Sequence, residues 1–529
     1  MEIITDNYVG FSTSAKGSST FQAFAPATNQ HIPGNFTRAT KEEFDEALAL
    51  AQKAFPVYSE LPVENRAKFL DAIADEIMNL GDTLLERCSL ESGLPLGRVT
   101  GERGRTCGQL KLFAQLLREG SWVDARIDTA QPDRQPLPKS DIRRMLVPIG
   151  PVAVYGASNF PLAFSTAGGD TASALAAGCP VVVKSHSSHP GTNALVTSAI
   201  VKAAKATGMP EGVFSSLYLD HEHSVKLVEH PVIKAVGFTG SQAIGMTLFN
   251  AAVSRPDPIP VYAEMSSINP VVMMENALKT KKDKIAAGLA GSVNLGVGQF
   301  CTNPGLILLE DNATSKAFLE AFAAEFKKSI PATMLNKGIH KACISGVKEL
   351  YDNNNISLVA TADQSADNEK NEAQPVAFSI DAKSFMADKA LHEEVFGPVT
   401  LFVLCKDNAQ IVEVLDSLEG QLTATIHADD SDQGQLGGIV KSISQRAGRL
   451  IYGGFPTGVE VCHSMVHGGP FPATSNANST SVGTGAILRF VRPLAYQDFP
   501  EAFLPEALKN GNPLNLMRLV DGVYTRDKI

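Results

Sequence analysis

The chain has few cysteines, no long apolar run and no surplus of positive charge, and each absence excludes a class of protein. Seven cysteines in 529 residues, none at CxxC spacing, do not make a disulfide framework, a zinc ribbon or a thioredoxin-like redox pair. No stretch approaches the roughly 18 continuous apolar residues that cross a bilayer. With 46 basic and 56 acidic residues, the net charge of −10 gives no bulk attraction for nucleic acid or anionic lipid. We therefore expect no nucleic-acid partner and no membrane partner.

Several well-known motifs are also missing. The sequence contains no GxGxxG, no GxxxxGK[ST], no HExxH and no GxSxG, which excludes standard Rossmann enzymes, P-loop NTPases, zinc proteases and α/β-hydrolases. The polar start MEIITDNYVGFST has no signal-peptide core, so we expect a cytoplasmic protein. The hydrophobic content of 44% is enough for a large core, and a chain of this size is most often an enzyme.

The pattern of apolar residues changes near residue 150. Thr40 opens a T-K-E-E capping box, and further helices are predicted over 64–80, 96–117 and 162–177. Residues 124–140 are polar, contain three prolines and are typical of an extended arm. From 151 to 263, continuous apolar strands alternate with helices, which predicts a parallel, doubly wound sheet. A second α/β stretch begins near residue 269, and the polar stretch 361–373 is expected to be a surface loop.

Three motifs carry residues of catalytic type. Cys301 follows a glycine-rich turn, as an exposed nucleophile does, although free cysteines are more often buried for structural reasons. Asn159 follows the strand PVAVY and can donate its amide to an oxyanion, or can simply form a turn. Glu264 ends an apolar strand and can act as a general base, or can reach solvent.

Three further motifs are typical of ligand binding. Lys184 ends the strand PVVVK, where it can bind ribose hydroxyls or phosphate, or be solvated. Gly240 and Ser241 connect a strand to a helix whose free amides suit a pyrophosphate. In the segment EEVFGP, Glu394 can hold ribose hydroxyls and Phe396 can line a ring; an ordinary acidic pair at a helix end is the alternative.

Together and in this order, the six motifs resemble the aldehyde dehydrogenase superfamily, with matches from about residue 148 to residue 398. Within it, the stretch NFPLAFSTAGGDTASALAAGCPVVVKSHSSHPGT resembles the 2,5-dioxopentanoate (α-ketoglutarate semialdehyde) dehydrogenases and the bacterial NADP-dependent fatty aldehyde dehydrogenases. The resemblance implies an α/β fold with two doubly wound parallel-sheet domains and an oligomerisation arm. The dinucleotide-binding domain is expected over 1–123 and 148–264, the catalytic domain over 265–467, and bridging segments over 124–147 and 468–529.

The resemblance also implies the chemistry. A Cys301 thiolate attacks the aldehyde, Asn159 stabilises the oxyanion, hydride passes to NADP or NAD, and Glu264 activates the water that hydrolyses the thioester. The residues expected to bind the cofactor are Lys184, Ser187, Gly240, Ser241, Glu394 and Phe396. No metal site is expected, and the histidines, including His186, His463 and His467, are expected to be structural or peripheral.

Two departures from the family pattern matter. Ser187 stands where many members have a glutamate, which favours NADP. The segment after Glu264 reads MSSI where many members have LGGK, so the geometry of this loop needs to be checked.

The sequence leaves the substrate and several alternatives open. We expect 2,5-dioxopentanoate first and long-chain fatty aldehydes second, with Phe160, Phe164 and Phe300 serving either tunnel. Arg103, Arg105 and the segment 474–484 are candidates for pairing with a carboxylate, although most such arginines are solvated. A cofactor-independent thioester or ester hydrolase, a CoA-acylating dehydrogenase and a non-catalytic relative are the alternatives. The arm implies a homodimer or homotetramer.

Overall fold

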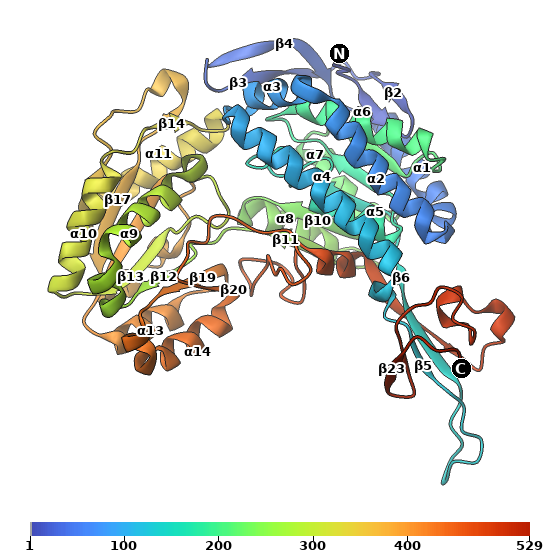
Figure 1. Ribbon diagram of the computed structural model, residues 1–529. Helices are drawn as coiled ribbons and strands as arrows, with labels where there is room; N and C mark the ends of the chain where they lie inside the picture. Colours follow the sequence, from blue (N-terminus) through green and yellow to red (C-terminus); the bar gives the residue numbers. More distant parts are fainter. Residues whose placement is uncertain (1–2) are drawn as a thin grey trace.

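The computed structural model describes residues 3–529 and contains two lobes and a projecting arm (Figure 1). The first lobe is built on a seven-stranded sheet in the order β11-β10-β7-β8-β9-β1-β2, in which β11 to β9 are parallel and β1 and β2 are antiparallel. Its strands are β1 (Asn7–Val9), β2 (Ser12–Ser14), β7 (Val152–Tyr155), β8 (Val181–Lys184), β9 (Phe214–Leu217), β10 (Ala235–Thr239) and β11 (Val261–Glu264). A hairpin of β3 (Thr20–Ala25) and β4 (Gln30–Thr37) lies beside it.

Helices cover both faces of this sheet because its strands are apolar on both sides. Their bounds are α1 (Lys41–Glu60), α2 (Val63–Asn79), α3 (Gly81–Ser92), α4 (Leu96–Glu119), α5 (Gly169–Ala177), α6 (Pro190–Ala206), α7 (His221–Glu229) and α8 (Gln242–Val253). Alternate residues of β7 face opposite ways: Val152 and Val154 pack with α2 and α4 to α6, whereas Ala153 and Tyr155 pack with α1, α7 and α8. Both faces are therefore buried, as a doubly wound sheet requires.

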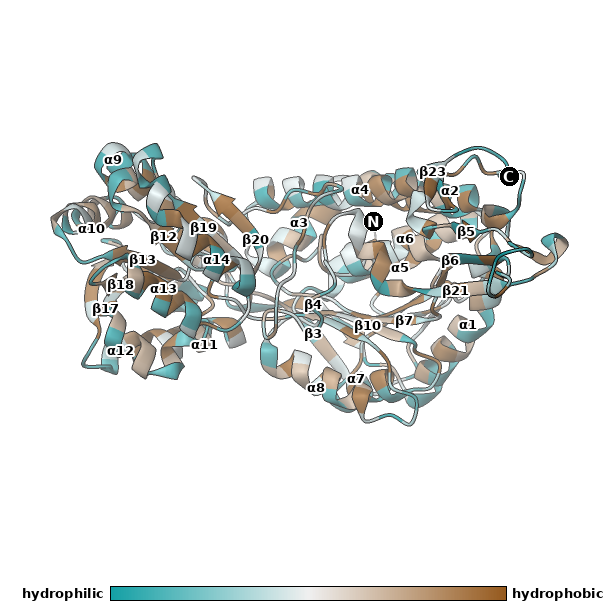
Figure 2. Cartoon of the chain, turned by 90° about the horizontal axis from the view of Figure 1, so that it is seen from below, coloured by the Kyte–Doolittle hydropathy of each residue, from teal (hydrophilic) through white to brown (hydrophobic). Residues whose placement is uncertain are grey.

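The second lobe repeats this architecture with the order β15-β17-β18-β13-β12-β19-β20, in which only β15 is antiparallel. Its strands are β12 (Val271–Met273), β13 (Leu306–Glu310), β15 (Ser357–Thr361), β17 (Val376–Asp381), β18 (Val399–Cys405), β19 (Gln421–His427) and β20 (Ala447–Tyr452). Its helices are α9 (Glu275–Asn294), α10 (Ala313–Phe326), α11 (Lys337–Asp352), α12 (Ala382–Ala387), α13 (Asn408–Ser417) and α14 (Leu436–Arg446). A short ribbon joins β14 (Ala332–Thr333) to β16 (Glu372–Ala373). Figure 2 shows the apolar strands of both lobes between more hydrophilic helix surfaces.

The arm is a separate five-stranded sheet in the order β21-β6-β5-β22-β23, and it projects away from both lobes (Figure 1). It contains β5 (Arg126–Asp128), β6 (Ile142–Pro148), β21 (Val491–Gln497), β22 (Arg518–Val520) and β23 (Val523–Thr525). Residues 468–490, which the sequence grouped with the bridging segment, lie elsewhere. Thr474 bridges to Glu264, and Arg489 pairs with buried Asp170 on α5, so this stretch closes the site and the first lobe rather than the arm.

The α/β class with two parallel-sheet domains is confirmed, and so are several local predictions. Thr40 and Glu43 form the expected capping box at the start of α1. The sequence missed β1 to β4 and α3, and it placed the start of the helix at 162 too early. That helix begins at Gly169 because the amides of Leu162 and Ala163 donate to the buried carboxylate of Glu102, which holds the preceding residues in turns. Across residues 3–529, none of the helices combines the length and the apolarity that a membrane span needs.

Candidate active site

A cavity of 680 Å³ lies between the two lobes, and residues from both line it. The carboxyl ends of β7, β8, β10 and β11 meet at this edge of the first sheet, because parallel strands end at the same side. The residues expected to be catalytic or to bind the cofactor all line this one cavity: Asn159, Lys184, Ser187, Gly240, Ser241, Glu264, Cys301, Glu394 and Phe396. The fold thus brings together positions that are up to 237 residues apart in sequence, from Asn159 to Phe396.

The nucleophile candidate and the base candidate are joined by a histidine. The Sγ atom of Cys301 lies 3.3 Å from Nε2 of His467. The same Nε2 lies 2.8 Å from Oε1 of Glu264, whose other oxygen accepts a 2.5 Å hydrogen bond from the Ser481 hydroxyl. Glu264 and His467 are 3% and 1% exposed, so this group is screened little by water. His467, expected to be structural or peripheral, thus contacts both the thiol and the carboxylate.

The environment shifts the pKa values of Cys301 and Glu264 in opposite directions. Burial and the adjacent Glu264 carboxylate raise the pKa of the Cys301 thiol well above its ordinary value, and Arg105 opposes this only weakly. Burial by itself would also raise the pKa of Glu264, but the neighbouring His467 and the hydroxyl of Ser481 bring it below its ordinary value. At neutral pH the site therefore holds a thiol beside a carboxylate, and the thiol needs a base in contact with it to become a nucleophile.

The backbone around Cys301 is shaped by a tight turn. Gly296, Val297 and Gly298 all have positive φ, at 59°, 60° and 66°. A side chain on Gly298 would collide with the carbonyl of Gly397. Only glycine at position 298 therefore lets this turn pack against the backbone at Gly397. One N–H of Asn159 donates to the carbonyl of Gln299 at 3.1 Å, which fixes the amide beside Cys301. The second N–H of this amide group donates to no other group within residues 3–529, so it is available to a ligand.

The loop that follows Glu264 is well fixed despite its unusual sequence. The Met265 amide donates to Ala473 at 2.8 Å, and Gly240 donates to the Glu264 carbonyl at 3.1 Å. The Ser267 hydroxyl donates to Gln421 at 2.9 Å. The two serines thus replace glycines in a loop that side-chain hydrogen bonds hold, and Glu264 keeps its place at the cavity wall.

The other end of the cavity offers groups for a phosphate-containing ligand. Burial, with a smaller contribution from nearby Arg38, lowers the pKa of Lys184 to about 8. Ser187 lines the same wall and is exposed to the cavity. Helix α8 begins there, and Ser241 at its N-cap makes no side-chain capping bond, which leaves the first amides of the helix free for an anion.

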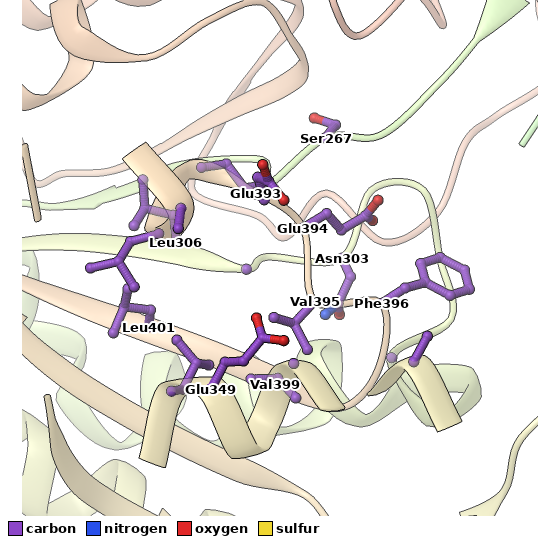
Figure 3. A pocket seen from close by; sticks show the side chains of 18 of the residues that line it. Ser267, Asn303, Leu306, Glu349, Glu393, Glu394, Val395, Phe396, Val399 and Leu401 are labelled. Carbon is purple, nitrogen blue, oxygen red and sulfur yellow. The ribbon is translucent and has the colours of Figure 1, made fainter. Parts of the chain in front are cut away.

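A smaller cavity of 290 Å³ lies next to this one, between α11 and the loop 391–399 (Figure 3). Burial raises the pKa of Glu394 to about 8, against hydrogen bonds from Ser266 and Ser267 that lower it. The small cavity also contains Glu349, Asp388 and Glu393, and its lining includes no lysine or arginine. An anionic substrate is therefore not expected to bind there.

His467 could not be found by motif matching. It lies 166 residues after Cys301 and 203 after Glu264, and nothing around it resembles a metal or catalytic motif. Its only signal is the sequence HGGPF, a histidine before a glycine pair in a segment rich in Gly, Ser and Thr. The thiol, carboxylate and imidazole ligand atoms lie within 4.8 Å of one another, a donor set that zinc accepts. The expectation of no metal site therefore stays a prediction.

Comparison with known proteins shows which family this chain resembles. Residues 12–449 match the model of the aldehyde dehydrogenase family. The chain is 49% identical over 524 residues to "Alpha-ketoglutaric semialdehyde dehydrogenase 2" of Azospirillum brasilense, covering 99% of both proteins. It is 48% identical to "Alpha-ketoglutaric semialdehyde dehydrogenase" of Acinetobacter baylyi over 493 residues, 93% of each. A solved structure of 1-pyrroline-5-carboxylate dehydrogenase from Thermus with bound NAD superposes with a TM-score of 0.78 at 21% identity, covering 93% of this chain and 92% of that one.

Proposed function

The chain belongs to the aldehyde dehydrogenase family and uses a nicotinamide cofactor to oxidise aldehydes, and we propose that its substrate is 2,5-dioxopentanoate, which becomes 2-oxoglutarate. The proposal rests on one observation: the chain is 48–49% identical to two α-ketoglutaric semialdehyde dehydrogenases over almost its whole length. The alternative of a cofactor-independent hydrolase is disfavoured, because Lys184, Ser241 and Glu394 line a second half of the cavity that hydrolysis does not need.

The cavity fits a dinucleotide. The free amides at the start of α8 and the Lys184 ammonium are the donors that a pyrophosphate and its riboses need, and Glu394 and Phe396 lie at the end towards Cys301. The cofactor, when bound, supplies the hydride acceptor. Gly240 lets the backbone turn closely there, since a Cβ at this position would meet the ring of Phe238 at 2.7 Å.

We further propose that NADP is used at least as well as NAD. Lys184 and Arg38 are close enough for the charge on Arg38 to depress the pKa of Lys184, so this wall of the cavity is positive. Ser187 adds a hydroxyl that can donate to a phosphate, where a glutamate would repel it.

The protein's own contribution to the first step is to remove a proton from Cys301. With the ring hydrogen on Nδ1, Nε2 of His467, at 3.3 Å from the sulfur, is placed to take that proton. The protonated Nε2 then lies 2.8 Å from the Glu264 carboxylate, which stabilises the imidazolium. This role of His467 was absent from the sequence-based scheme. The Cys301 sulfur then attacks the aldehyde carbon, while the Asn159 amide and the Cys301 backbone N–H stabilise the oxyanion.

Hydrolysis of the thioester relies on Glu264 and on Ser481, which donates a hydrogen bond to it. Glu264 accepts a proton from water, and Ser481 holds its other oxygen so that the carboxylate keeps its orientation. A water base is of no use to an enzyme that passes the acyl group to CoA, so Glu264 favours the free acid as product.

The arm supports assembly into a dimer or a larger oligomer. Its outer strand β23 exposes Val523 and Tyr524 at 66% and 67%, and Phe503 nearby is 73% exposed. An apolar sheet edge that projects from the body of the protein is typically covered by a second copy.

The test of the substrate is a comparison of kcat/KM for 2,5-dioxopentanoate, succinate semialdehyde and the aldehydes from hexanal to dodecanal, followed by absorbance of the reduced cofactor. We expect the dioxo acid to be the best substrate, with no requirement for CoA. A steady rise with alkyl length, with the dioxo acid among the poorest, would replace this proposal with a fatty aldehyde dehydrogenase. Acid formation without any cofactor would support the hydrolase.

A further inference from the structure

Helix α4 presents a polar stripe to the interior of the first lobe. Arg98, Glu102, Arg105 and Gln109 follow one another at intervals of four, three and four residues, which places them on one helix face. None of the four is classed as exposed, and Glu102 and Gln109 are 2% and 3% exposed. Polar groups on an inward face are costly unless they are paired or bind something.

Glu102 is bonded through both carboxylate oxygens, to the backbone and to Arg98. Oε1 of Glu102 accepts from the amides of Leu162 and Ala163, both at 2.9 Å. Its Oε2 is 2.6 Å from Nη1 of Arg98. Glu102 therefore anchors α4 to the chain that follows Asn159, and Arg98 is held in place by this anchor.

Both arginines rest on the phenylalanines beside the nucleophile. The Arg98 guanidinium lies 4.5 Å from the ring centre of Phe160 and 5.3 Å from that of Phe300, the residue before Cys301. The Arg105 guanidinium lies 5.1 Å from the ring centre of Phe164. The three rings pack edge to face in series, with centres 5.2 and 5.3 Å apart, and Phe164 lies 6.0 Å from the His467 ring.

Arg105 differs from Arg98 in having an unused donor. Its Nη1 is buried without a hydrogen-bond partner among residues 3–529, and no ion pair holds the guanidinium. Burial lowers the pKa of Arg105, while the charges of Glu102, Cys301 and Glu264 oppose that effect. The ring of Phe164, on which the guanidinium rests, lies 6.0 Å from the His467 ring beside Cys301. Two guanidinium groups against one carboxylate leave one positive charge in excess on this stripe.

We propose that Arg105, with Arg98 beside it, forms the subsite that binds the carboxylate of the aldehyde substrate. This rests on the proposed function and deepens it. A carboxylate would satisfy the free Nη1 donor and neutralise the excess charge, and the phenylalanine wall would hold the short carbon chain between the arginine and Cys301. A plain fatty aldehyde would leave both the donor and the charge unpaired, so the site selects against it.

Neighbouring arginines do not fit this role. Arg103 donates to the carbonyl of Gly81 from another face of α4. Arg449 approaches Cys301 from the second lobe, but its Nη1 and Nη2 donate to the carbonyls of Gly458 and Pro456. Each keeps a buried Nε without a partner among residues 3–529, but backbone carbonyls hold its Nη groups in place, whereas no such bond holds Arg105. We therefore assign both to local structure.

The test compares Arg105→Gln, Arg105→Lys and Arg103→Gln in the full-length enzyme. Each is assayed with 2,5-dioxopentanoate and with pentanal, a neutral aldehyde of the same carbon number. We expect Arg105→Gln to lower kcat/KM for the dioxo acid by about 10²-fold, mainly through KM, and to change that for pentanal by less than about 3-fold. Arg105→Lys should recover part of the loss, and Arg103→Gln should leave the ratio of the two substrates unchanged.

The outcomes separate this inference from the proposed function. If wild type prefers the dioxo acid but Arg105→Gln retains that preference, the carboxylate subsite lies elsewhere and the function stands. If wild type prefers pentanal and longer aldehydes, the proposed function fails first. Equal losses on both substrates would show that Arg105 only supports the structure, and a thermal unfolding scan of each variant identifies that case.

Discussion

The two halves of the cavity are built in different ways. On the cofactor side, Lys184 ends strand β8 and Gly240 and Ser241 follow strand β10 of the same parallel sheet, so their positions depend on short stretches of sequence. Around Cys301, the groups come from segments far apart in the chain: His467 and Ser481 from a late irregular stretch and Arg105 from an early helix. The cofactor half is built from short motifs at the ends of neighbouring strands. The half around Cys301 is assembled by tertiary folding from segments distant in sequence. Mutations can separate the contributions of the two halves.

The largest effect is expected at Cys301, in the half of the cavity that tertiary folding assembles. Cys301→Ser should lower turnover by roughly 10⁴-fold or more, because a hydroxyl ionises far less readily than a thiol in this buried site. Cofactor binding, followed by fluorescence of the reduced dinucleotide, should be retained, since the cofactor half is separate. Cys462→Ser is the matched control and should be fully active. Normal turnover of the Cys301 variant would place the nucleophile elsewhere.

These differences in construction explain what the sequence could predict. Strand-end residues such as Lys184 and Glu264 were identified because alternation of strands and helices fixes which edge they reach. The sequence predicts a structural or peripheral role for His467 because no local pattern marks it, and only the packing of residues 468–490 against the first lobe reveals its contacts. The sequence named Arg103 and Arg105 together, and only their neighbours distinguish them: Gly81 for the first and Phe164 for the second.

The second effect concerns Glu264, the base proposed for the hydrolysis step. Glu264→Gln keeps the size of the side chain and loses its basicity, so steady-state turnover should fall by about 10²- to 10³-fold. A stoichiometric burst of reduced cofactor should remain in a stopped-flow experiment, because hydride transfer precedes hydrolysis. If the burst vanishes, Glu264 is needed for the thiol as well, and its 2.8 Å contact with His467 is the route.

The third prediction tests the histidine that joins thiol and carboxylate. His467→Asn should slow the burst itself by about 10²-fold at pH 7, and the rate should recover as pH rises because solvent then removes the thiol proton. The direction follows from the raised pKa of Cys301: without a base in contact, the thiolate becomes abundant only at high pH. His463→Asn is the control, since the hydrogen bond of His463 within residues 3–529 is to the Thr484 hydroxyl, at 3.3 Å, and not to Cys301 or Glu264. An unchanged pH profile for His467→Asn would assign the proton transfer to Glu264 alone.

The smallest effect is expected in the cofactor half of the cavity, where Ser187 is one of several hydrogen-bond donors. Ser187→Glu places a carboxylate on the wall that holds Lys184, and it should shift the ratio of kcat/KM for NADP over NAD towards NAD by about 10-fold. Ser187→Ala removes the hydroxyl without adding charge and should shift the ratio less. Because Arg38 and Lys184 remain, the positive field survives, which limits the change. A wild-type enzyme with a strong preference for NAD would show that Ser187 does not set the choice. If the NADP over NAD ratio of Ser187→Glu equals that of wild type, the 2′-phosphate binds away from this wall. Short motifs at strand ends would then not be enough to predict the cofactor half of the site.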